Sequence, residues 1–202
     1  MTFAKTTPKL SIALFILSLC VSTTLALPLS KQDGDQLQRK IEEIAKNGSA
    51  VPVQARRTPV SENEVNSYLA FNAKDNIPRG LTDPQINIIG DGALSGRTLV
   101  DLGEFKRHRN SQGFMDPLNY LSGKVPITAR GVLRTRDGKG QFQFGSATIL
   151  GVPLPKPVLQ ELVTFFTRTP EQPKGFNLDA PFDLPAKIRE VVIGNAEAVV
   201  MQ

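Results

Sequence analysis

The chain has 202 residues, of which 40% are hydrophobic and 21% charged, and a formal net charge of +5, a composition typical of a globular protein. It holds one cysteine, one histidine and no tryptophan, which excludes an intramolecular disulfide and a zinc site built from several Cys and His ligands. A serine–histidine–aspartate triad could use only His108 as its base.

The first 26 residues have the pattern of a secretory signal peptide. Lys5 and Lys9 flank the start of an apolar run from Leu10 to Leu19, and Thr24-Leu25-Ala26 resembles a small-x-Ala cleavage site. The run is shorter than the ~20 apolar residues of a membrane span, so cleavage is favoured over an uncleaved anchor. We expect an exported protein of the periplasm or cell envelope, with a single domain over 27–202.

Cys20 raises the alternative of a lipoprotein acylated at its cysteine. That pattern has a small residue before the cysteine, and Leu19 is not small, so the soluble chain is favoured. Removal of residues 1–26 would lower the net charge to +3, because Lys5 and Lys9 are lost. A mild charge of this kind does not favour nucleic acid as a partner.

Two N-terminal helices are predicted. The first spans Asp33–Lys46, and Asn47-Gly48 ends it. Asn47-Gly48-Ser49 is also a glycosylation sequon, although the helix stop is the favoured interpretation. The second helix begins at Ser61, where Ser61 and Glu64 form a capping box.

The rest of the chain is rich in predicted antiparallel strands. Residues of alternating character in the strand Val125–Arg136 predict one apolar and one polar face. Gly131 and Gly145 predict bends or bulges that let the sheet curl. The predicted hairpins pair Gln85–Ile89 with Ala93–Phe105, Val125–Arg136 with Gln141–Ile149, and Ile188–Ile193 with Ala196–Val200.

The segment Pro155–Thr167 predicts the clearest helix. Its apolar stripe is broad, which indicates that other elements surround it on several sides. The sequence therefore predicts an α+β fold in which a strongly curved antiparallel β-sheet wraps around a long apolar helix, with additional N-terminal helices.

A set of apolar residues on the predicted sheet and helix is the candidate ligand-binding groove. An ordinary packed core is the alternative, since contiguous apolar faces usually pack on each other. The favoured ligand is a lipid or other hydrophobic small molecule held inside the curl of the sheet. The groove residues are Ile127, Leu133, Phe142, Phe144, Leu162, Phe165 and Phe166.

Two basic groups are weaker candidates. Lys106, Arg107 and Arg109 flank His108 and form a candidate site for an anionic headgroup at a membrane surface, or a solvated loop. Arg130, Arg134 and Arg136 share one strand face, where they would contact acidic headgroups or a partner, or would simply line the wet side of a sheet. No carboxylate pair, metal site, cofactor motif or catalytic residue is predicted.

The segment Ser61-Glu62-Asn63-Glu64-Val65-Asn66-Ser67-Tyr68-Leu69, with the order of elements after it, resembles small bacterial envelope proteins similar to the tubular lipid-binding (TULIP-like) superfamily. That resemblance implies a bent sheet that encloses an apolar channel, and binding of a lipid without catalysis. The expected function is thus a non-catalytic envelope protein that binds an apolar ligand. The alternative is a structural or protein-interaction module of the envelope with a filled core, and a hydrolase is a third, disfavoured class.

Overall fold

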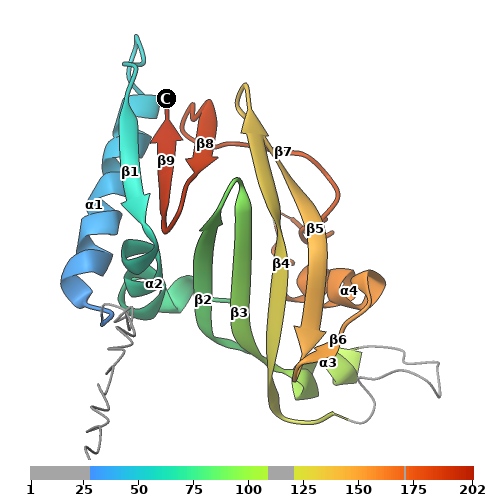
Figure 1. The fold of residues 1–202 in the computed structure, drawn as a ribbon. Helices are drawn as coiled ribbons and strands as arrows, with labels where there is room; N and C mark the ends of the chain where they lie inside the picture. Colours follow the sequence, from blue (N-terminus) through green and yellow to red (C-terminus); the bar gives the residue numbers. More distant parts are fainter. Residues whose placement is uncertain (1–27, 109–120, 171) are drawn as a thin grey trace, which may run out of the picture.

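The computed structural model describes residues 28–108, 121–170 and 172–202, and it has α+β architecture with two antiparallel sheets (Figure 1). The large sheet has the order β2-β3-β4-β5-β6, with β7 beside β5, and the small sheet has the order β1-β9-β8. The helices are α1 (Lys31–Gly48), α2 (Glu62–Phe71), the 3₁₀ turn η1 (Lys74–Asn76), α3 (Leu102–His108) and α4 (Lys156–Phe166). The strands are β1 (Arg57–Ser61), β2 (Leu81–Gly90), β3 (Ala93–Asp101), β4 (Lys124–Arg136), β5 (Lys139–Ile149), β6 (Val152–Pro153), β7 (Phe182–Asp183), β8 (Glu190–Ile193) and β9 (Glu197–Met201).

The two N-terminal helices begin where side chains cap them. Ser30 accepts a hydrogen bond from the Asp33 amide at the start of α1, and the predicted capping box of Ser61 and Glu64 starts α2. Glu64 is buried, and the Lys40 ammonium donates to both of its carboxylate oxygens at 2.6 and 2.9 Å. This ion pair joins α1 to α2.

The predicted first helix is confirmed, but α1 ends at Gly48, two residues after the predicted last residue Lys46. The Asn47 amide donates to the Gln54 carbonyl at 2.8 Å and to the Gln202 side chain at 3.0 Å. Its side-chain nitrogen therefore has a structural role in the fold. Gln202 in turn is buried and donates to the carbonyls of Ile44 and Ala186.

Helix α2 covers the outer edge of β2 with its side chains. The Asn66 amide accepts from the Ile86 N–H and donates to the Ile86 carbonyl, both at 2.8 Å, and Glu62 accepts from the Ile88 N–H at 2.6 Å. These bonds replace a neighbouring strand. Covering an edge in this way keeps it from pairing with another chain.

The edge of β8 is covered by the tips of the two long hairpins. The Gly138 N–H donates to the Arg189 carbonyl at 2.9 Å, and the Gly92 N–H donates to the Ile193 carbonyl at 3.4 Å. Between them, the Thr135 hydroxyl donates to the Val191 carbonyl and accepts from its N–H. These bonds fix the small sheet to the end of the large sheet that carries the β2–β3 and β4–β5 turns.

One face of the large sheet, here the covered face, packs against other elements. On β4 this face carries Val125, Ile127, Ala129 and Leu133, as the alternation predicted. One end lies under α3, α4 and the segment around Leu178, which together form the main core cluster. The other end lies under the small sheet, where Ile88, Ile193 and Ala198 form a second cluster.

The predicted wrapping of a strongly curved sheet around a long helix is wrong. Helix α4 has 11 residues, a length of about 16 Å, whereas β4 with 13 residues spans about 43 Å. The sheet is neither strongly curved nor closed, and the small sheet occupies the part of its covered face that a longer helix would need. An irregularity is present where Gly131 and Gly145 predicted a bend or bulge, because the register shifts between Arg130 and Gly131 and leaves Gly145 without a partner. Gly131 also leaves room for a ring, since a Cβ there would lie 2.3 Å from Cζ of Phe142.

Candidate interaction surface

The residues predicted to line a lipid groove are packed in the two core clusters. Ile127, Leu162 and Phe166 are buried, and Phe142, Phe144 and Phe165 pack against the same cluster from half-buried positions. Leu133 lies apart from these six, in the second cluster below the small sheet. The structure therefore brings six of the seven residues together.

Aromatic contacts account for much of the packing around α4. The Phe165 and Phe166 rings are 4.9 Å apart in an edge-to-face arrangement, and Phe105 of α3 lies 5.4 Å from Phe165. None of the three pockets described below is lined by these rings. Binding of an acyl chain between sheet and helix stays a prediction, without the curled sheet on which it was based.

Of the basic residues near His108 that the structure describes, Lys106 is half-buried and Arg107 is exposed. Lys106 and Arg107 belong to α3, and the Lys106 ammonium donates to the Leu121 carbonyl. Phe105, next to them in the chain, is buried in the main core cluster. The third predicted headgroup residue, Arg109, lies outside the described residues.

The second face of the large sheet, here the open face, carries the other candidate site. No residue of this face belongs to either core cluster within the described chain. On β4 it holds Thr128, Arg130, Val132 and Arg134, which confirms the predicted polar face. Exposed polar residues of the same face are Gln85 and Asn87 on β2, and Gln141, Gln143 and Ser146 on β5.

Three exposed arginines stand on this face: Arg97 of β3 and Arg130 and Arg134 of β4. The register places Arg130 opposite Ser95, and Arg97 opposite Thr128, so Arg97 and Arg130 are diagonal neighbours about 7–8 Å apart. Arg134 lies four residues further along β4, about 13 Å from Arg130. Within the described residues no salt bridge involves any of the three.

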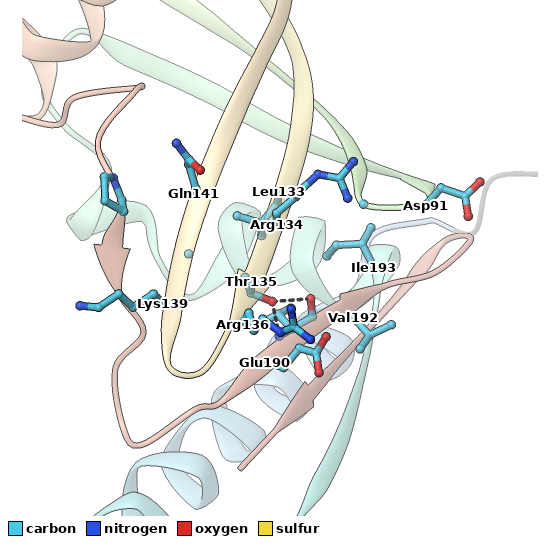
Figure 2. A pocket seen from close by; sticks show the side chains of 14 residues that line it. Asp91, Leu133, Arg134, Thr135, Arg136, Lys139, Gln141, Glu190, Val192 and Ile193 are labelled. Carbon is cyan, nitrogen blue, oxygen red and sulfur yellow. Dashed lines mark hydrogen bonds between the residues drawn. The ribbon is translucent and has the colours of Figure 1, made fainter.

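Arg136 has a different environment from the other two predicted β4 arginines. By the alternation of β4 it belongs to the same face, two residues after Arg134. It stands at the end of the sheet, however, where Figure 2 shows its guanidinium beside Glu190 of β8. We therefore define the arginine face as Arg97, Arg130 and Arg134. Arg97 was missed in the sequence, because only the register between β3 and β4 shows that it stands beside Arg130.

A pocket of about 730 Å³ lies where the open face ends, between the β4–β5 hairpin and β8 (Figure 2). Arg134 extends from β4 toward the β2–β3 turn, while the Asp91 carboxylate points away from it. The Thr135 hydroxyl is occupied by its two bonds to Val191. The pocket therefore extends the arginine face with polar and charged groups of both signs.

Two other pockets lie away from the arginine face. One of about 660 Å³ is lined by residues such as Val53, Leu184 and Arg189, and one of about 580 Å³ by Leu29, Phe71 and other residues between α2 and β2. No group of three or more metal-ligating side chains occurs within the described residues. In the same part of the chain, no helix is long and apolar enough to cross a membrane.

Comparison with known proteins gives no relative from which a role could be inferred. No protein-family model, no curated protein and no solved structure matches the chain. The resemblance to tubular lipid-binding proteins thus stays a prediction, and the function of this chain has to be inferred from the geometry of its own surfaces.

Proposed function

We propose that this protein is a non-catalytic interaction module of the cell envelope, which binds a partner protein on the open face of its large sheet. The observation that carries the proposal is the contrast between a filled core on the covered face and an uncovered, arginine-bearing open face. The location in the envelope rests on the predicted signal peptide.

The size and composition of the open face support this proposal. Strands β2 to β5 have 9–13 residues each and would give a face about 19 Å wide and about 30 Å long, or roughly 600 Å². That is close to the ~800 Å² that each partner contributes to a standard protein interface. Arginine is enriched at such interfaces, and half-buried Val132, between Arg130 and Arg134, and half-buried Leu99, next to Arg97 on β3, supply apolar surface.

The protection of the sheet edges supports a face rather than an edge as the interface. The β2 edge is covered by Asn66 and Glu62, and the β8 edge by the two hairpin tips. On the far side, β6 and β7 cover the two ends of β5, and a register shift lies between Arg130 and Gly131. Addition of a partner strand is therefore disfavoured at the β2 and β8 edges and at the two ends of β5.

Site-specific photo-crosslinking in cells tests the proposal. A photoreactive amino acid replaces Ser146, which is exposed and lies opposite Arg130 across β4 and β5. We expect a covalent adduct of higher mass that contains a second protein. Asn87, on the same face of β2, provides a second position for the probe.

Glu42, exposed on α1, is the matched control position. It should give no adduct, or a different one. Failure to crosslink from both Ser146 and Asn87, or the same adducts from Glu42, would contradict the proposal. Displacement of a fluorescent fatty acid from the purified protein tests the acyl-chain alternative, and loss of that binding in Phe144→Gln would support it.

A further inference from the structure

We infer that the partner bound by the open face is acidic, and that Arg97 and Arg130 form the seat for its carboxylates, with Arg134 as a second contact. This inference rests on the proposed function, because it names the chemistry of the partner at the same surface. It follows from the charges, the spacing and the hydrogen bonds of the arginine face.

Among the described residues, those directly opposite the three arginines on the neighbouring strands carry no negative charge. Opposite Arg130 lie Ser95 and Ser146, opposite Arg97 lie Thr128 and Gln85, and opposite Arg134 lies Gln141. None of these residues is a carboxylate. Two guanidinium groups on diagonal positions repel each other, so an anion supplied from outside would relieve that repulsion.

One arginine is held in a conformation suited to such an anion. The Nε of Arg134 donates to the Gln143 side-chain oxygen at 3.2 Å. This bond leaves the two terminal nitrogens of the guanidinium available to a carboxylate, with which arginine forms paired hydrogen bonds. Gln143 therefore acts as a positioning residue for Arg134.

The burial of Ser95 indicates that side chains also lie close over the centre of the face. Ser95 is 5% exposed, although no described element packs on this side of the sheet. Its direct neighbours on the adjacent strands are Asn87 and Arg130. Ser95 is therefore covered by neighbouring side chains of its own sheet, and Arg130 stands directly beside it.

The spacing of the arginines favours an extended partner over a single small anion. Arg97 and Arg130 are close enough to share one carboxylate, whereas Arg134 is about 13 Å away from Arg130. Four residues of an extended chain cover the same length. An acidic segment with carboxylates on alternate residues would thus meet both positions.

Binding of poly-L-glutamate to the full chain, measured by fluorescence anisotropy, tests the inference. We expect saturable binding that weakens as the salt concentration rises from about 0.05 to about 0.5 M. The variant R97Q/R130Q/R134Q should bind about tenfold more weakly or worse. Gln143→Ala should weaken binding by a smaller factor, because it removes only the bond that orients Arg134.

The matched control is R57Q/R79Q/R168Q, which removes the same charge from exposed arginines elsewhere. Equal losses in the two triple variants would overturn the inference, since binding would then depend on net charge alone. Equal affinity of the arginine-face variant and the wild type would also overturn it. Preferential binding to anionic lipid vesicles over poly-L-glutamate would replace the acidic protein with a membrane.

The crosslinking experiment separates the failure of this inference from that of the proposed function. If the Ser146 adduct forms but is unchanged in R97Q/R130Q/R134Q, the interface exists and the acidic partner is wrong. Loss of the adduct in that variant, and its retention in R57Q/R79Q/R168Q, would support both. If the wild type forms no adduct from the open face, the acidic-partner inference and the proposed function both fail.

Discussion

The two faces of the large sheet consist of alternate residues of the same strands, yet they have opposite environments. Along β4, Val125 and Ile127 are buried under α3 and α4, while Arg130 and Arg134 are exposed on the other side. Hydrophobic burial therefore explains the covered face. It does not explain why three arginines on the open face have no salt bridge within the described residues, and the proposed binding role would give them a physical reason.

The largest expected effect is on the covered face. Leu162→Ala in α4 should lower the free energy of unfolding by about 2–5 kcal/mol, because a buried side chain is removed from the main cluster. Denaturant unfolding measures the change, and Val132→Ala on the open face should cost less than about 1 kcal/mol. A loss below about 1 kcal/mol for Leu162→Ala would favour a groove that is open to an apolar ligand.

A second prediction concerns the way that glycine shapes the covered face. Gly131→Ala should destabilise the fold by about 1–3 kcal/mol, since the new Cβ would lie 2.3 Å from Phe142 Cζ and 2.5 Å from the Gln143 carbonyl. Gly96→Ala is the control on the adjacent strand, where the nearest atom would be 3.5 Å away. Similar melting temperatures for the two variants would show that Phe142 moves aside at little cost.

A third prediction concerns the β2 edge of the same sheet. Asn66→Ala leaves both polar groups of Ile86 without their side-chain partner and should cost about 1–3 kcal/mol, or less if water replaces the amide. The control is Asn63→Ala, which loses one hydrogen bond to Asp33. Chemical denaturation of both variants, with hydrogen exchange at Ile86, measures the effect. Unchanged exchange at Ile86 would contradict the role given to Asn66.

Local patterns predicted the individual elements better than their arrangement. The hairpin around Asp137 and Gly138, the capping box at Ser61 and the two faces of β4 are all found, because each depends on residues close in sequence. The strand predicted to reach Phe105 instead ends at Asp101 and continues as α3. Leu102 and Phe105 are three residues apart, a spacing that places two side chains on the same side of a helix, and both are buried in α3.

The arrangement of the sheets depends on contacts that the sequence does not show. The broad stripe of α4 predicted a surrounding sheet, but α3 and the segment around Leu178 share that role with one end of the covered face. Likewise, the diagonal placement of Arg97 beside Arg130 depends on the register between strand positions more than 30 residues apart in the sequence. The candidate site could therefore be predicted only in part, from the alternation within β4.

The unfolding of R97Q/R130Q/R134Q at low and high salt tests most directly whether the arginines serve binding rather than stability. Removing three mutually repelling charges should leave the free energy of unfolding equal to that of the wild type, or up to about 1 kcal/mol higher at low salt. The difference should vanish near 1 M salt, where the screening length is about 3 Å. A variant less stable than the wild type at both salt concentrations would contradict the account, because the arginines would then hold the fold together.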